Sequence, residues 1–427
     1  MSHPKDRRSP ISRREFLRRA GMTGVAVPSM AAILAACSKD NGNGAGSSGA
    51  SGATDGGLQL ARPDNPITLP ITSDNPAIPD DVQPEAGPLK ILGYSAYIWK
   101  KVLNQFTAAT GADVEYSVFD TPEQMVQMIQ AGGSHFDLIV TVTLENVGKL
   151  AQGGLIQPLN RTYIPNFSNL WQSLQSPFYD VNSQYTVPYT VYTTGIGFRN
   201  DLVTDDIAAM DNPYDILFDP KYAGQTHLLN GARDTLSAAL LRMGADVNTD
   251  DTAVLDQAQQ MLLGGVAAMN WKFDHTDYNE LGQFLIHQTW SGQVSYYQYY
   301  LPKGLEITQY SYVWPPVAAG GRDGILTNDV FAITKGAASP VLAHTMIDFL
   351  LDPTNAITNY SYEGFQPPIA QFDNAKAVSD GIVPANLANS LLTEDEFNLP
   401  NAVRELELAP SVNQLYQQIY QEVTGGA

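Results

Sequence analysis

The chain of 427 residues has a single cysteine, few basic residues and no long apolar run. One cysteine excludes an internal disulfide, so stability has to come from a large hydrophobic core. Beyond residues 20–36, no apolar stretch approaches the roughly 18 to 20 residues that cross a membrane, which predicts a soluble body. The chain has 24 basic and 44 acidic residues. A surface with this excess of negative charge repels phosphate backbones and acidic lipid. These shortages argue against a disulfide-stapled module, a multi-span membrane protein and a nucleic-acid-binding protein.

The first 37 residues are typical of an export signal. The cluster from Ser12 to Arg18 contains paired arginines, as twin-arginine signals do, and the apolar stretch from Ala20 to Ala36 is too short and too rich in Gly and Ala for a stable span. The run Leu34–Cys37 is typical of a lipobox, in which the cysteine sulfur accepts a diacylglycerol. We therefore predict a signal peptide over residues 1–36 and a lipid anchor at Cys37, on the outer face of the cytoplasmic membrane. The alternative is that Cys37 is an incidental small residue.

A polar, flexible composition follows the anchor. Residues 41–57 are almost entirely Gly, Ser, Ala and Asn, which cannot bury apolar area. The stretch up to Pro88 contains seven prolines and is expected to be stiffer and extended. Residues 37–87 are thus predicted to be a lipid-anchored flexible linker. About 340 residues remain, which favours two domains.

The first part of the body alternates strands with helices. Residues 89–93 and 112–119 are typical of strands, and the intervening helix repeats apolar residues at three- and four-residue steps until Gly111. A second helix follows Pro122, and residues 136–140 form an apolar run suited to a buried parallel strand. This order predicts a doubly wound α/β lobe.

Later residues predict a second lobe and a return to the first. Residues 185–189 and 193–198 are expected to be strands that leave the first lobe, followed by a turn-rich connector over 213–224. Helices are expected from about 234 to 243 and from 251 to 263, residues 324–333 can carry the chain back, and 340–351 is an amphipathic helix. The predicted fold is α/β with two lobes and crossover hinge strands. Lobe I takes residues 88–193 and 329–370, and lobe II takes 194–328 and 371–427.

Ten short stretches, in their order and spacing, resemble the spermidine/putrescine-binding proteins of ABC transporters over most of residues 89 to about 370. They are Leu89–Tyr97, Phe136–Val140, Gly154–Gln157, Asn166–Leu170, Val187–Tyr189, Gly195–Gly197, Asp219–Gly224, Ala232–Asp234, Trp290–Gly292 and Asp329. The resemblance implies a type II periplasmic-binding-protein fold whose lobes close on a small cationic solute. It also implies delivery to ABC permease subunits, and we expect a monomer.

The resemblance further implies a ligand site in which carboxylates hold ammonium groups and aromatic faces enclose the methylene stem. A buried cation needs a paired anion, and aromatic rings add cation–π attraction. The residues carried over by position are Tyr94, Ser95, Tyr97, Asp234, Trp290 and Asp329, with Asp329 as the principal amine anchor. Relatives often carry acidic residues at the positions of Ala96 and Gly231 and an aromatic one at that of Thr327. Glu145 can replace one lost carboxylate, and an amino-acid derivative or a quaternary amine stays an alternative solute.

Each site residue also has a structural interpretation. Asp329 can hold a turn, Asp234 can cap a helix with Thr235, and Trp290 can belong to the core. The tyrosines of residues 296–300 can be a ligand platform or interlobe packing. No nucleophile elbow, Walker loop, dinucleotide fingerprint or metal-ligand spacing is found, so we predict no enzyme, no cofactor and no metal. A sensor that has lost transport is the remaining alternative.

Overall fold

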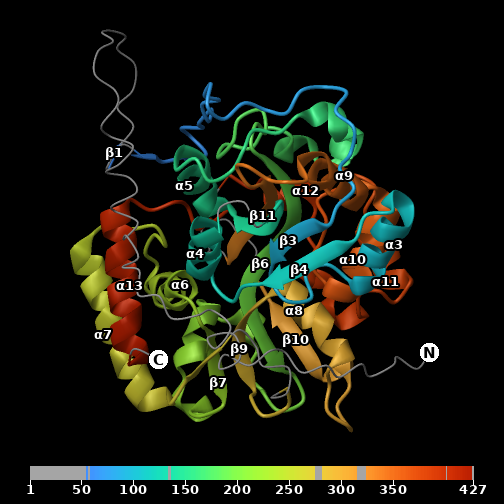
Figure 1. The fold of residues 1–427 in the computed structure, drawn as a ribbon. Helices are drawn as coiled ribbons and strands as arrows, with labels where there is room; N and C mark the ends of the chain where they lie inside the picture. The colour runs from blue at the N-terminus through green and yellow to red at the C-terminus, as the bar shows by residue number, and fades with distance from the viewer. Residues whose placement is uncertain are drawn as a thin grey trace, which may run out of the picture.

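The computed structural model describes residues 54–55, 58–132, 136–274, 281–314, 324–400 and 402–425. One mixed sheet runs through the molecule, in the order β4-β3-β5-β11-β6-β9-β7-β8, with β10 paired to β6 (Figure 1). Its strands are β3 (Leu89–Gly93), β4 (Val114–Val118), β5 (Leu138–Thr143), β6 (Thr186–Arg199), β7 (Thr226–Leu229), β8 (Lys272–Asp274), β9 (Ile286–Trp290), β10 (Tyr310–Val313) and β11 (Ile325–Ile333). In the described part of the chain, no helix has both the length and the apolar character needed to cross a membrane.

Lobe I surrounds the parallel strands β3, β4 and β5. Its helices are α3 (Lys100–Thr110), α4 (Pro122–Gly132), α5 (Val147–Gln152), α9 (Pro340–Leu351) and α10 (Pro353–Glu363). Successive residues of a strand point to opposite faces. Ile91 accordingly packs with α3 and α9, whereas Leu92 packs with α4 and α5. Burial on both faces explains why both β3 and β5 are rich in Leu, Ile and Val.

Lobe II surrounds β7, which is parallel to both β8 and β9. Its helices are α6 (Ala232–Met243), α7 (Thr252–Met269) and α13 (Pro410–Thr424), and they share one apolar core with β7 and β9. Figure 1 shows α13 lying alongside α7 at one side of the molecule. The expected connector over 213–224 consists largely of the two 3-10 helices η6 (Pro213–Phe218) and η7 (Pro220–Tyr222).

Two long antiparallel strands, β6 and β11, belong to both lobes. The two strands expected within residues 185–198 are one strand of 14 residues, β6. It pairs with β11 from Thr186 to Thr194, with β9 from Thr194 to Phe198 and with β10 from Ile196 to Arg199. Pro188, which lacks an N–H, lies where the β6–β11 register shifts between Asp329 and Val330. A proline is tolerated inside a central strand at such an irregularity, so the strand continues through it.

A third apolar core lies between the lobes. It combines residues such as Trp171 and Val191 with Tyr310 and Tyr312 of β10. Around it lie α8 (Ser291–Tyr296), α11 (Asn374–Ser379), the 3-10 helix η11 (Ala385–Ser390) and α12 (Glu394–Phe397). The remaining short elements are β1 (Thr54–Asp55), β2 (Leu58–Gln59) and the 3-10 helices η1 (Leu144–Asn146), η2 (Arg161–Tyr163), η3 (Pro165–Asn169), η4 (Gln172–Leu174), η5 (Ile207–Ala209), η9 (Tyr297–Tyr299) and η10 (Ile307–Gln309).

Residues 58–87, which we name the strap, are bound along lobe I. The flexible linker predicted over residues 37–87 is therefore wrong from Leu58 onward, whereas the extended course expected for the proline-rich stretch agrees with the structure. Ile67 and Leu69 are buried in the core of lobe I, and the Ile67 backbone exchanges hydrogen bonds with Phe178 and Val181. The sequence does not reveal this attachment, because the few buried apolar residues of the strap follow no helical or strand periodicity. Backbone hydrogen bonds, which leave no pattern in the sequence, also hold the strap in place. The predicted signal peptide and Cys37 lie outside the described residues.

Candidate functional site

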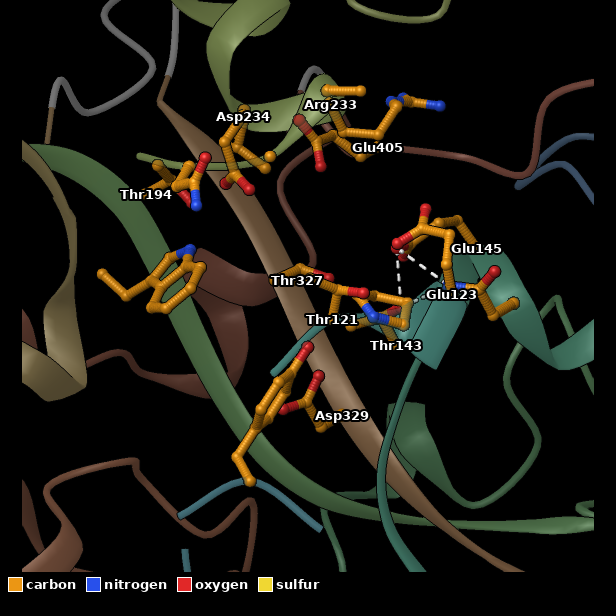
Figure 2. Close-up of a pocket in the computed structure, with 18 of the residues that line it drawn as sticks. Thr121, Glu123, Thr143, Glu145, Thr194, Arg233, Asp234, Thr327, Asp329 and Glu405 are labelled. Atoms are coloured by element: carbon orange, nitrogen blue, oxygen red, sulfur yellow. Dashed lines mark hydrogen bonds between the residues drawn. The ribbon is translucent and has the colours of Figure 1, made fainter. Parts of the chain in front are cut away.

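A cavity of about 380 Å³ opens between the lobes (Figure 2). Small-molecule sites usually measure roughly 300 to 1,000 Å³. Alternate residues of the crossover strands line it, Tyr192 and Thr194 from β6 and Ile325, Thr327 and Asp329 from β11. The loop after β3, the start of α4 and the end of β5 contribute from lobe I, and α6, Trp290 and α13 contribute from lobe II.

Asp329 is the most buried carboxylate of the cavity, with 2% of its surface exposed. It lies within β11, paired to Thr143 and Thr190, so the alternative of a turn residue is wrong. The Tyr97 hydroxyl donates to Oδ2 at 2.6 Å, and the Tyr192 hydroxyl donates to Oδ1 at 3.1 Å. Burial raises the pKa of Asp329 to about 7, against the lowering effect of these two hydrogen bonds. Among the described residues, no basic side chain forms an ion pair with this carboxylate.

Aromatic rings surround Asp329. Phe365 packs against Tyr97 and Tyr192, with ring centroids 5.1 and 5.2 Å apart respectively. Trp290 meets Tyr192 edge-on at 6.4 Å, and Tyr94 lies 6.2 Å from Tyr97. Rings around a single buried carboxylate suit an organic cation, because the carboxylate neutralises its charge and the rings cover its apolar part.

A second acidic group occupies the other end of the cavity. In Figure 2, Asp234 and Glu405 lie at one end and Asp329 lies at the opposite end. Asp234 is in the first turn of α6, whose N-cap is Gly231, so the alternative of Asp234 as the cap is wrong. A Cβ at Gly231 would lie 2.8 Å from Asp234 Oδ2, so glycine leaves room for this carboxylate. Burial, then the charges of Glu405 and Glu145, raise the pKa of Asp234 well above its usual range, although Trp290 donates a hydrogen bond to it.

Glu145 and Glu405 complete this second group. Glu145 follows β5 and accepts a hydrogen bond from Thr143 at 2.6 Å. Burial, with the charge of Glu405, raises the pKa of Glu145. Glu405 accepts a hydrogen bond from Ser237 at 2.6 Å. The guanidinium of Arg233 donates to Leu406 O and Asn248 Oδ1, at 3.0 and 2.7 Å, and so is engaged with the chain beside the cavity.

Acidic side chains outnumber basic ones in the lining of the cavity. Its carboxylates are Glu123, Glu145, Asp234, Asp329 and Glu405, and its basic residues are Lys149 and Arg233. Cations are therefore favoured over anions throughout the cavity.

The structure brings six of the seven predicted ligand residues to this cavity: Tyr94, Tyr97, Glu145, Asp234, Trp290 and Asp329. Ser95 is the exception, and its predicted contact needs correction. The chain turns back after β3, with a Tyr97 N–H to Tyr94 O hydrogen bond and a left-handed Ala96, and this turn leaves Ser95 exposed outside the lining. Trp290 is half-buried: it packs against the apolar core of lobe I and also lines the cavity, so its position agrees with both interpretations.

The tyrosines of residues 296–300 do not line the cavity. Tyr297 is buried against His287, and Tyr296, Tyr299 and Tyr300 pack with one another and with Tyr362. Interlobe packing, one of the two interpretations of this cluster, thus agrees with its position.

Sequence reasoning missed most of the other lining residues, among them Glu123, Tyr192, Phe365 and Glu405. Tyr192 could have been found from strand alternation, since it lies two residues before Thr194 and four after Pro188 on a strand directed at the cleft. Glu405 lies in an irregular stretch before α13 and carries no local signal.

Fold and site together define a two-lobe binding protein for a small solute. The family of bacterial extracellular solute-binding proteins matches residues 101–385, and the chain belongs to this family. The predicted family is therefore confirmed.

Among known proteins, the chain is similar to the spermidine/putrescine-binding periplasmic protein of Escherichia coli K12, with 26% identity over 79% of this chain and 92% of that protein. The putrescine/cadaverine-binding protein of Pseudomonas aeruginosa is 25% identical over 63% of this chain and 75% of its own. A solved structure from Listeria monocytogenes, assigned to spermidine/putrescine ABC transport, has a TM-score of 0.66 and 25% identity, over 79% of this chain and 98% of that one. The TpPotD lipoprotein of Treponema pallidum has a TM-score of 0.65 at 20% identity, over 78% and 98%. These likenesses confirm the predicted two-lobe periplasmic-binding fold, and the relatives named here are binding proteins rather than enzymes.

Proposed function

We propose that this chain captures a polyamine, such as putrescine or spermidine, between its lobes and delivers it to ABC permease subunits. The anchor at Cys37 would hold it as a monomer on the outer face of the cytoplasmic membrane. The observation that carries the proposal is the buried Asp329 carboxylate, which is enclosed by aromatic rings and faces a second acidic group across the cavity.

The chemistry of an aliphatic diamine matches this arrangement end to end. One ammonium group would pair with Asp329, the methylene stem would lie against Tyr97, Tyr192 and Trp290, and the other ammonium would meet the group of Asp234, Glu145 and Glu405. An ammonium next to Asp329 offsets the cost of burying its charge. Because both lobes contribute to the lining of the cavity, the full set of contacts with the ligand forms only when the lobes are closed. Ligand therefore shifts the equilibrium between open and closed forms toward the closed form.

Calorimetric titration of the chain from residue 38 with putrescine and spermidine tests the proposal. Asp329→Asn should weaken binding by about 3 kcal/mol or more, because it removes the charge partner of a buried cation. Asp211→Asn, which changes an exposed carboxylate outside the cavity, is the matched control and should bind as the wild type does. Absence of heat with every diamine and polyamine would overturn the ligand assignment.

A quaternary amine is the second candidate, favoured by the number of rings around a single buried carboxylate. Such a ligand needs an aromatic box but no second acidic group. Titration with choline beside putrescine separates the two. Replacing Glu145 and Glu405 with Gln should weaken putrescine binding strongly and choline binding little.

A further inference from the structure

Tyr97 reaches the cavity from an irregular loop between β3 and α3. Ala96, directly before it, has a positive φ of 61°, and only one weak turn hydrogen bond, from Tyr97 N–H to Tyr94 O at 3.4 Å, is made within the loop. The sheet ends at Gly93 and the helix starts at Lys100, so neither element fixes Tyr97. The Tyr97 ring packs against Tyr189 and Phe365, and its hydroxyl also lies 3.0 Å from Thr190 Oγ1. The backbone position of Tyr97, in contrast, depends on contacts from outside this loop.

Asn359, in α10, holds it. Its Oδ1 accepts the Trp99 N–H at 2.7 Å, and its Nδ2 donates to Tyr97 O at 3.3 Å and to the Tyr189 hydroxyl at 2.8 Å. The Tyr189 hydroxyl in turn donates to Tyr97 O at 2.7 Å. Asn359 is 2% exposed. Its amide oxygen and its NH2 group therefore form their hydrogen bonds within the protein and not with solvent.

We propose that Asn359 is a positioning residue for the cationic ligand, which fixes the Tyr97 backbone so that the Tyr97 hydroxyl orients the Asp329 carboxylate toward the cavity. This inference rests on the proposed function, since it takes Asp329 to be the partner of an ammonium group. Asn359 does not line the cavity and acts only through Tyr97. The Tyr97–Asp329 bond is short, at 2.6 Å, and a loop shift of about 1 Å would break it.

Loss of the Tyr97–Asp329 hydrogen bond would also change the protonation of Asp329. Seven titratable groups of the described residues interact with Asp329 from the elements packed around it: Tyr94, Tyr97, Glu145, Tyr179, Tyr189, Tyr192 and Glu363. The two hydrogen bonds favour the anion, whereas burial and the charge of Glu145 favour the neutral acid. Without the Tyr97 bond, the pKa of Asp329 rises further and less of it is anionic at neutral pH.

The first test is Asn359→Leu, which keeps the approximate side-chain shape but removes all three hydrogen bonds. Putrescine binding is titrated from about pH 6 to 8.5. We expect affinity at neutral pH to fall about tenfold and the pH midpoint of binding to move upward. Asn355→Leu on the same helix, which removes only a bond to Phe349 O, should keep both within about twofold of the wild type. A folded Asn359→Leu variant with wild-type affinity and midpoint would overturn the proposal.

A double-variant cycle with Tyr97→Phe separates positioning from general weakening. If Asn359 acts through the Tyr97 hydroxyl, Asn359→Leu in the Tyr97→Phe background should cost about twofold or less. Independent, multiplying losses would contradict that route. If Asn359→Leu does not fold, Tyr189→Phe removes one hydroxyl of the same network, and the same expectations apply to it.

Hydrogen exchange of the ligand-free chain distinguishes failure of this inference from failure of the proposed function. The Trp99 amide should exchange faster in Asn359→Leu than in the wild type or in Asn355→Leu. Wild-type protein that binds no polyamine would overturn the proposed function, whereas unchanged exchange at Trp99 would overturn the anchoring of the loop by Asn359.

Discussion

At the scale of single residues, the buried carboxylate of the site lowers the stability of the ligand-free protein. Asp329 is buried without a basic partner among the described residues, and its pKa is about 7 instead of 3.8. A pKa raised by folding means that the folded chain keeps a proton that the unfolded chain has lost. Between pH 3.8 and about 7 the free energy of unfolding therefore declines as the pH rises, and the whole cost is present above pH 7. The residue that would bind the cation thus weakens the empty protein.

This cost predicts that Asp329→Asn stabilises the ligand-free chain at alkaline pH. The variant should unfold with a free energy about 2 to 4 kcal/mol higher than the wild type at about pH 8, because an amide has no buried charge, while its oxygen can accept from one tyrosine hydroxyl and its NH2 can donate to the oxygen of the other. Below about pH 4 the difference should disappear, since Asp329 is then neutral in both states. Urea unfolding at the two pH values measures it. A variant less stable than the wild type at pH 8 would show that the charge is compensated within the protein.

At the scale of elements, the strap is part of the fold of lobe I. Besides its apolar anchors, Glu85 accepts the N–H groups of Val341 and Leu342 at the start of α9, at 3.1 and 2.9 Å. Asn75 donates to Ile156 O from a buried position. A carboxylate at a helix N-terminus satisfies free N–H groups and matches the helix dipole. The strap therefore ties the segment that follows the predicted anchor to one lobe.

Two neighbouring residues of the strap test whether its packing stabilises the protein. Leu69 is 1% exposed and Ile71 is 48% exposed. Leu69→Ala should lower the free energy of unfolding by about 2 to 5 kcal/mol, because it opens a cavity in the core. Ile71→Ala removes a similar side chain from the surface and should change it by about 0.5 kcal/mol or less. Urea denaturation compares them, and equal losses would mean that the strap separates from the body in solution.

The elements also show what the sequence could predict. The first three strands of lobe I and the helices between them were predicted, because strand-like stretches alternate with helical apolar repeats and Gly111 marks a helix end. Strand β6 was predicted as two pieces, 185–189 and 193–198, with a gap over residues 190–192, and only the pairing of these residues with β11 shows that the strand is continuous. Asp329 and Asp234 were found through the order of short family stretches. Glu405 and Asn359 were not, since their roles depend on contacts with residues far away in the chain.

At the scale of the whole molecule, the lobes meet again across the mouth of the cavity. Gln417 of α13 donates to Glu123 of α4 at 3.0 Å, and both residues line the cavity. The helix α13 packs with α6 and α7 in lobe II, whereas α4 packs on the sheet of lobe I. Their separation therefore reports the relative position of the two lobes. Because the chain has one cysteine, Cys37, a chain from residue 38 offers a cysteine-free background for a cross-link.

Ligand should bring this pair together. In the variant Glu123→Cys with Gln417→Cys, we expect putrescine to increase the rate of cross-linking by a short bismaleimide several-fold, because ligand favours the closed state in which these side chains approach. The matched control is Gln59→Cys with Gln152→Cys, since these residues exchange hydrogen bonds of 2.9 and 3.0 Å between the strap and α5 within lobe I. Its rate should be the same with and without putrescine. If putrescine binds but does not change the cross-linking rate of the first pair, the lobes keep their relative position when the cation enters the cleft. Capture would then depend on the acidic and aromatic lining alone.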